Sequence, residues 1–248
     1  MKKIIPISLI LLSLSFTTPP SWEGKNDLAI ASSNSKPLPY KKWNLGFPVS
    51  AKAAFLYDGM MLKEAGLSEE AFQNAYKGYQ YLLAKNRLKN SDYLTICDFS
   101  QSSKNKRLYV IDMKNEKLLI NTYVAHGRNS GMEYATRFSN KATSRQSSLG
   151  FYVTSSTYRG SHGLALTING LEPGFNNNAA RRRIVIHGSK YVGANYLELR
   201  KYMGRSFGCP AVPQKECTQI INFIKNGSCL FIYHPDKKYQ NGSKILNG

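Results

Sequence analysis

The fold class turns on YLTICDF, residues 93–99, where the spacing of apolar residues changes from helical to strand-like. Short apolar runs of this kind continue downstream, and loops rich in glycine, serine and asparagine separate them. These runs predict strands over residues 93–99, 108–113, 117–124, 149–155, 164–169, 183–187 and 230–233, and one helix over residues 216–225. We therefore expect a mostly β domain at residues 91–236, preceded by an α-helical N-terminal segment.

That helical segment covers residues 49–90. Ala51–Ala65 is rich in alanine, leucine and methionine, and Gly66 follows it. Ser68 is the expected N-cap of a second helix, because two glutamates come directly after it in the positive first turn. Tyrosines and Phe72 recur on one face of this helix, which predicts packing onto the β domain rather than ligand binding. The polar residues 237–248 are expected to form a tail.

The N-terminus reads as a secretory signal. A basic Met1-Lys2-Lys3 precedes an apolar run at residues 4–16, which is too short to span a membrane comfortably. We expect a signal peptide at residues 1–20, with cleavage between residues 17 and 31, and a proline-bearing linker at residues 21–48. The mature protein is then exported to the periplasm or cell-wall space, with no stable membrane span after signal removal.

The chain carries a formal net charge of +19. An anionic cell envelope is one partner that such a charge favours, and a lysine-rich background composition is the alternative. Nucleic acid is not an expected partner, since no recognition module for it is present.

Two short stretches carry candidate chemistry. A small-residue loop at residues 205–210 presents Cys209, and an apolar run at residues 184–188 ends in His187 and Gly188. A cysteine and a histidine are the minimum set for thiol nucleophilic catalysis. Histidine precedes cysteine here, unlike in papain-like enzymes, and the caspase signature is absent. Sortases share this order, but their cysteine follows a different strand motif.

The neighbouring motifs recur in one known family. His187-Gly188 is followed by Ser206-x-Gly208-Cys209. Further matching motifs are Ala125-His126-Gly127-Arg128, Phe138-Ser139-Asn140, Ser148-Leu149-Gly150, Tyr158-Arg159-Gly160-Ser161-His162-Gly163, Gly204-Arg205-Ser206 and Gly208-Cys209-Pro210-Ala211-Val212-Pro213. Over roughly residues 90–235 the chain resembles the L,D-transpeptidase catalytic (YkuD-like) domain, and most closely its murein L,D-transpeptidase branch.

The residues and the resemblance together suggest roles at the site. Cys209 is the expected nucleophile and His187 the proton carrier, and the resemblance implies that the Gly188 carbonyl fixes the tautomer of His187. The backbone N–H groups of Gly208 and Cys209 are candidate oxyanion donors. Ser206 is expected to hold the loop beside the substrate.

Three further residues are candidates for substrate binding. Arg205 is expected to attract a substrate carboxylate, with a structural ion pair as the alternative. His126 and His162 each precede a glycine, and they either line the same cleft or are ordinary loop histidines. Arg181–Arg183 is expected to be a solvated loop or to steer an anionic polymer towards the site.

Two positions depart from the commoner family pattern. Phe207 stands where a histidine precedes the glycine-cysteine pair, and Pro210-Ala211 replaces an aliphatic residue followed by arginine or asparagine. The first change leaves His187 as the catalytic histidine. Both changes concern substrate choice more than thiol chemistry.

The resemblance implies an exported peptidoglycan L,D-transpeptidase that acts on stem peptides through a cysteine thioester and is acylated by carbapenems. An L,D-carboxypeptidase or another peptidoglycan hydrolase that uses the same site is the alternative, and a non-catalytic basic wall-binding protein is a second one. No cofactor is expected, and no metal either, because paired CxxC or HExxH spacing is missing. Two alternatives remain for the other three cysteines. Either Cys217 and Cys229 form a disulfide, or Cys97, Cys217 and Cys229 are all small buried hydrophobic residues.

Overall fold

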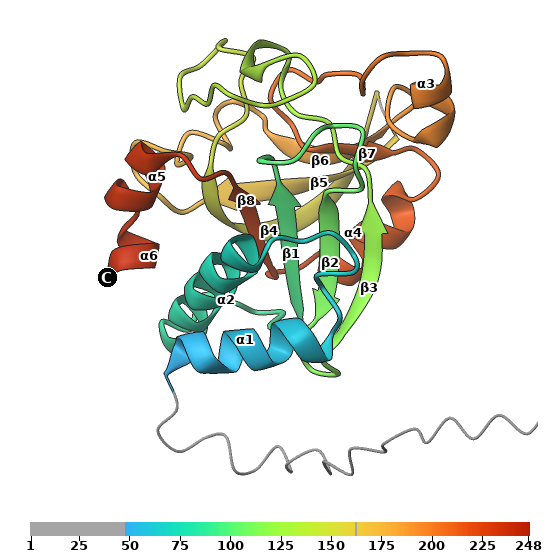
Figure 1. Cartoon of the computed structure of the whole chain (residues 1–248). Coiled ribbons are helices and arrows are strands. Elements are labelled where there is room, and N and C mark those ends of the chain that lie inside the picture. Colours follow the sequence, from blue (N-terminus) through green and yellow to red (C-terminus); the bar gives the residue numbers. More distant parts are fainter. Residues whose placement is uncertain (1–47, 162) are drawn as a thin grey trace, which may run out of the picture. The chain divides into compact units, whose positions relative to one another are not determined.

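A mixed β-sheet organises the described part of the chain, which a computed structural model gives as residues 48–161 and 163–248 (Figure 1). These residues belong to one compact unit. The strands are β1 (Tyr93–Asp98), β2 (Leu108–Asp112), β3 (Lys117–Thr122), β4 (Gly150–Gly160), β5 (Gly163–Gly170), β6 (Val185–Ser189), β7 (Ala211–Pro213) and β8 (Cys229–Tyr233). The expected mostly β fold with a helical N-terminal segment is confirmed. The predicted signal peptide, nearly all of the predicted linker, and His162 lie outside the described residues.

The sheet is almost closed on itself. Its strand order is β3-β2-β1-β8-β4-β5-β6-β7, which places β3 and β7 at the two edges. The chain that leaves β3 reaches the opposite edge, where Ala125 forms an antiparallel bridge to Ala211 in β7. The N–H of Ala125 donates to the carbonyl of Ala211 over 2.8 Å. The sheet is therefore barrel-like, and the edge strand that follows Cys209 is partly covered.

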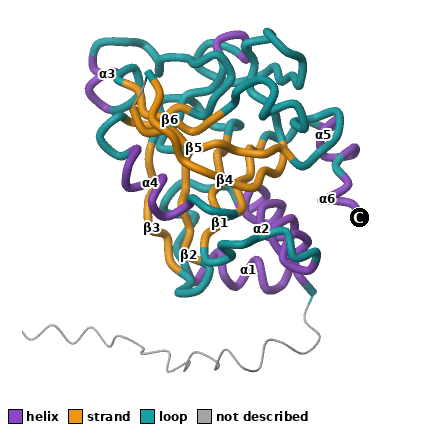
Figure 2. The backbone as a smooth tube through the Cα atoms, turned by 180° about the vertical axis from the view of Figure 1, so that it is seen from behind, coloured by secondary structure: helices purple, strands orange, loops and turns teal. Residues whose placement is uncertain are grey.

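Helices cover the sheet unevenly. The helices are α1 (Val49–Gly59), α2 (Glu69–Ala84), α3 (Ala194–Glu198), α4 (Cys217–Ile224), α5 (Lys237–Gly242) and α6 (Lys244–Asn247), with a 3₁₀ turn at Arg128–Ser130. Figures 1 and 2 show α1 and α2 at one end of the sheet and the long loops at the other end. The site lies among those loops, away from the two N-terminal helices.

Helix α2 begins and packs as its sequence predicts. Ser68 is the N-cap, and its hydroxyl accepts a hydrogen bond from Ala71 N over 3.2 Å. Its apolar face is buried. At Gly78 the helix approaches the sheet so closely that a Cβ there would lie 2.0 Å from the ring of Phe151. The aromatic face is therefore a packing surface, as expected.

Two segments differ from the expectation. Helix α1 ends at Gly59 rather than near Ala65, because Met61 adopts a left-handed conformation with φ of 50° and Leu62 N donates back to Tyr57 O over 3.1 Å. The predicted polar tail at residues 237–248 instead forms α5 and α6. Tyr239, Ile245 and Leu246 are buried there, and the Tyr239 hydroxyl donates to the buried Glu172 over 2.9 Å. Three apolar anchors in a polar segment are enough to dock it.

Candidate active site

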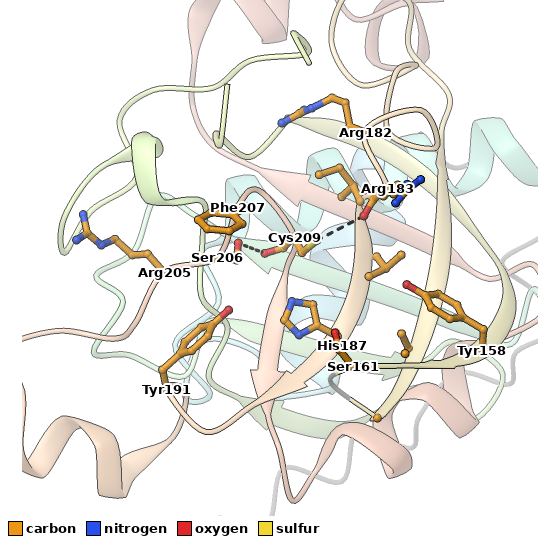
Figure 3. A pocket seen from close by; sticks show the side chains of 15 residues that line it. Tyr158, Ser161, Arg182, Arg183, His187, Tyr191, Arg205, Ser206, Phe207 and Cys209 are labelled. Atoms are coloured by element: carbon orange, nitrogen blue, oxygen red, sulfur yellow. Dashed lines mark hydrogen bonds between the residues drawn. The ribbon is translucent and has the colours of Figure 1, made fainter. Parts of the chain in front are cut away.

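Strand pairing brings Cys209 to His187. Cys209 lies two residues before Ala211, the first residue of β7, and β7 runs parallel to β6 with Ala211 opposite His187. The cysteine therefore enters the sheet beside the strand that carries the histidine. Figure 3 shows both side chains projecting into the same pocket. The sequence did not predict β7, since prolines flank its short run, yet this strand fixes the geometry of the pair.

Gly208 allows the loop to turn under Cys209. Its φ is +122°, a conformation that residues with a Cβ rarely adopt. A Cβ at this position would lie 2.7 Å from the carbonyl oxygen of Gln146 and 3.2 Å from Nη2 of Arg182. The glycine before the cysteine is thus required both by the backbone conformation and by close packing.

Ser206 is a buried clip for the same loop. Its hydroxyl donates to the Cys209 carbonyl over 2.6 Å and accepts the Gly208 N–H over 3.0 Å. The Ser206 N–H in turn donates to the His126 carbonyl over 3.0 Å. This is the loop-holding role expected of the serine. The Gly208 N–H is used inside the loop, which leaves the Cys209 N–H as the candidate oxyanion donor of the two.

His187 is buried and held by its neighbour. Its Nδ1 lies 3.0 Å from the Gly188 carbonyl oxygen. A carbonyl only accepts hydrogen bonds, so Nδ1 carries the proton and Nε2 is the basic nitrogen. A Cβ on Gly188 would lie 3.0 Å from Cys217 and from Gln214, so the strand end is tightly packed. The Gly188 carbonyl and this tight packing therefore orient the imidazole.

The thiol lies in a setting that favours its neutral form. Burial raises the pKa of Cys209, while hydrogen bonding from the Val185 N–H and the charge of Arg182 act in the opposite direction. Its Sγ lies 3.8 Å from the Arg183 carbonyl oxygen, in the geometry of a weak S–H donor. Burial thus favours the thiol over the thiolate when no substrate is bound.

Cys209 and His187 share a pocket of about 410 Å³. Three arginines contribute to its wall, and none of the described residues that line it is acidic. The other lining residues with polar or aromatic groups are Tyr158, Ser161, Tyr191, Ser206 and Phe207. Figure 3 shows Tyr158 on one side of Cys209 and Tyr191 with Arg205 on the other. A pocket of this size and charge suits a short anionic chain that crosses the thiol.

The expected substrate-binding residues fall into different places. Arg205 lines the pocket, and its Nη1 donates to the Gly131 carbonyl over 3.2 Å. Its guanidinium is thus held by the backbone and not by the structural ion pair that was the alternative among the described residues. His126 does not line the pocket: it is buried, with Nδ1 2.7 Å from Nη2 of the buried Arg107. Burial, followed by the charge of Arg107, lowers the pKa of His126 to about 3. His126 therefore stays neutral and helps to hold the buried segment whose backbone pairs with Ser206.

Arg182 ties a second loop to the site. Its guanidinium donates to the carbonyls of Ser139 and Gln146 over 2.7 and 2.6 Å, and it also contacts the hydroxyl of Ser148. The prediction of a merely solvated loop is thus wrong for this arginine, although Arg181 and Arg183 are exposed. Sequence reasoning also assigned no role to Tyr191. No local motif marks it, because only the folded loop brings it to Cys209.

Phe207 occupies the position of the missing histidine and points outward. It is 64% exposed, and the guanidinium of Arg145 lies over its ring at 4.8 Å. Phe207 also lines the pocket beside Cys209. An exposed aromatic at the rim changes what the pocket contacts rather than how the thiol is activated.

All four cysteines are free, and Cys97, Cys217 and Cys229 are buried. In the described ranges no group of three or more histidine, cysteine or acidic side chains is arranged to hold a metal ion. The same residues contain no helix that is long and apolar enough to cross a membrane.

The chain matches the family model described as L,D-transpeptidase catalytic domain over residues 63–233, which is more than half of its length. That range includes α2, so the helical segment lies partly within the family's region. A comparison with curated proteins found no match.

Solved structures give distant likenesses. An L,D-transpeptidase from Mycobacterium smegmatis is 9% identical, with a TM-score of 0.37 over 58% of this chain and 59% of that one. The cell shape determining protein Pgp2 from Campylobacter jejuni is 14% identical, with a TM-score of 0.38 over 70% of this chain and 62% of that one. An L,D-transpeptidase from Xylanimonas cellulosilytica is 14% identical, with a TM-score of 0.34 over 76% of this chain and 94% of that one.

Proposed function

The chain belongs to the L,D-transpeptidase catalytic domain family, and on that premise we propose that it is an exported enzyme that transfers peptidoglycan stem peptides through a thioester on Cys209. The substrate is a tetrapeptide stem, cleaved at the bond after meso-diaminopimelate. The enzyme works in the periplasm or cell-wall space, and the anionic envelope is a partner that its net charge of +19 favours. The predicted signal peptide supports export.

In the first half-reaction the sulfur forms a bond to the peptide carbonyl. Because the thiol is neutral at rest, Nε2 of His187 takes its proton as the sulfur attacks. The Cys209 N–H stabilises the oxyanion that develops on the carbonyl oxygen. When the intermediate collapses, the C–N bond breaks and His187 returns the proton to the amine of the departing D-alanine. A thioester on Cys209 remains.

In the second half-reaction an amine of another stem attacks the thioester. His187 takes a proton from that amine and returns it to the sulfur, which regenerates the thiol. With water in place of the amine, the same steps release a shortened stem, and the protein acts as an L,D-carboxypeptidase. Transfer and hydrolysis thus share one acyl-enzyme and one site.

One observation supports this proposal above the others. The β6–β7 register sets the thiol beside an imidazole whose Nδ1 is already committed to the Gly188 carbonyl at 3.0 Å. A buried histidine held in one tautomer beside a cysteine is what acyl transfer to a thiol requires. A non-catalytic wall-binding protein has no need for this arrangement.

Incubation of purified sacculi with the protein, followed by mass analysis of the muropeptides, tests the proposal. New cross-linked dimers indicate transfer, and shortened stems alone indicate hydrolysis. Cys209→Ala should abolish both. Cys97→Ala, which removes a buried thiol outside the pocket, should retain activity. If wild-type protein removes no terminal D-alanine, the substrate assignment fails; if it also retains sacculus binding, the wall-binding alternative gains.

A further inference from the structure

A second pocket adjoins the one that holds Cys209. It has a volume of about 450 Å³ and shares Tyr191 and Arg205 with the first pocket. Figure 3 shows these two shared residues together on the side of Cys209 opposite Tyr158. A ligand that extends past Arg205 from the thiol therefore enters this second pocket.

Four cations surround the second pocket: Arg128, Arg200, Lys201 and Arg205. No acidic side chain lines it, and no carboxylate forms an ion pair with any of the four in the described part of the chain. The gathering of like charges is unfavourable until an anion neutralises it. Uncompensated basic side chains around a concave surface are thus the signature of a site for anionic groups.

The floor of the pocket is built firmly. Met203 is fully buried and its sulfur accepts the Gly193 N–H over 3.2 Å. Gly204 donates to the Tyr191 carbonyl over 3.0 Å, and a Cβ on Gly204 would lie 2.5 Å from that tyrosine's side chain. These contacts fix the backbone that carries the basic residues. The side chains of Tyr196 and Tyr202 add apolar faces and hydroxyls to the walls.

We propose that this basic pocket binds the carboxylates of a peptidoglycan stem peptide, an inference that rests on the proposed function. A stem peptide carries several carboxylates, and two adjoining pockets accommodate either one long stem or two neighbouring stems. The carboxylates belong either to the remote part of the stem that acylates Cys209 or to the acceptor stem. In both cases the pocket binds a carboxylate through basic side chains, and kinetic measurements distinguish the two stems.

Binding is measured first, by calorimetry with a purified tetrapeptide muropeptide and the Cys209→Ala protein, which binds without turnover. Arg200→Ala/Lys201→Ala removes two exposed charges whose side chains make no hydrogen bond or ion pair among the described residues. We expect affinity to fall about tenfold, and the loss to shrink at high ionic strength. Lys63→Ala/Lys77→Ala, which removes two exposed lysines near α1 and α2, is the matched control and should bind normally.

Turnover then separates the two sources. A slower release of D-alanine in the Arg200→Ala/Lys201→Ala protein assigns the pocket to the acylating stem. Normal D-alanine release with fewer dimers and more hydrolysis assigns it to the acceptor stem. Unchanged affinity in this double variant overturns the inference. Binding of poly(glycerol phosphate) without binding of the muropeptide also overturns it.

The proposed function fails separately. If wild-type protein never releases D-alanine while Cys209→Ala still binds the muropeptide through Arg200 and Lys201, the pocket assignment stands and the catalytic proposal does not.

Discussion

Replacement of Gly208 by alanine probes the packing that places Cys209. The new Cβ has to accept a φ of +122° and would lie 2.7 Å from the Gln146 carbonyl oxygen and 3.2 Å from Nη2 of Arg182. A left-handed conformation costs a residue with a Cβ about 1–2 kcal/mol. Overpacking adds about 1–3 kcal/mol. We therefore expect the free energy of unfolding to fall by about 3 kcal/mol, which lowers Tm by roughly 6–12 °C for a domain of this size.

Gly174 supplies a matched control within the same chain. Its φ is +82°, but nothing lies within 4 Å of a Cβ built there. Gly174→Ala thus bears the backbone cost without the clash, and it should lower Tm by roughly 2–8 °C. Thermal unfolding followed by circular dichroism compares the two variants with the wild-type protein, and the difference between them isolates the packing of Gly208.

Activity should separate the variants further. Relief of the clash moves the loop away from Gln146, and a displacement of about 1 Å at a reacting group costs about 10²-fold in rate. We expect Gly208→Ala to be acylated by a carbapenem about 10²-fold more slowly, and Gly174→Ala at the wild-type rate. If Gly208→Ala matches Gly174→Ala in both Tm and acylation, the packing argument for this glycine is refuted.

Three more perturbations follow from the site. His126 binds a proton with a pKa of about 3 when folded and about 6.5 when unfolded. The unfolded state thus takes up a proton that the folded state refuses, and the free energy of unfolding should fall by about 2–3 kcal/mol between pH 7 and pH 4.5. Urea titrations of His126→Gln, which does not titrate, should lack this part of the slope; an identical slope contradicts the assignment. Arg182→Gln should move the pH dependence of carbapenem acylation to higher pH, because the Arg182 charge lowers the pKa of Cys209. Arg182→Lys keeps the charge and should restore the midpoint, so a midpoint that is equal in all three proteins counts against the charge effect. Ser206→Ala should lower stability by about 1–3 kcal/mol and slow acylation, because the Gly208 N–H and the Cys209 carbonyl lose their partner. Ser206→Thr keeps the hydroxyl and is the control. If Ser206→Ala is acylated at the wild-type rate in stopped-flow measurements, Ser206 does not hold the Cys209 loop in its reactive position.

Local patterns predicted most of the strands and the cap of α2. Ser68 with its two following glutamates, and the apolar run that ends in His187, are signals that lie within a few residues of the structure they specify. The end of α1 was missed because Met61, not a glycine, takes the left-handed position. Helices α5 and α6 were missed because Tyr239, Ile245 and Leu246 are too few to give a helical pattern until the sheet offers them a surface.

The candidate pair Cys209 and His187 could be selected from residue type and motif, but its geometry could not be predicted. Strand β7 is three residues long and bounded by prolines, so only its partner β6 reveals it. The sequence left open whether His126 lines the cleft or is an ordinary loop histidine. Its contact with the buried Arg107, 19 positions earlier in the sequence, holds it outside the cleft. Tyr191 and the basic pocket depend on long-range packing that no local pattern carries.

Intact-mass analysis of carbapenem labelling tests the assignment of Cys209 and His187 most directly. The wild-type protein should gain one adduct, located on the peptide that contains Cys209, and Cys209→Ala should gain none. His187→Asn keeps an N–H donor for the Gly188 carbonyl but has no basic nitrogen, so it should label about 10²–10⁴-fold more slowly while remaining folded by circular dichroism. An adduct on another cysteine, or a folded His187→Asn protein that labels at the wild-type rate, would contradict the account.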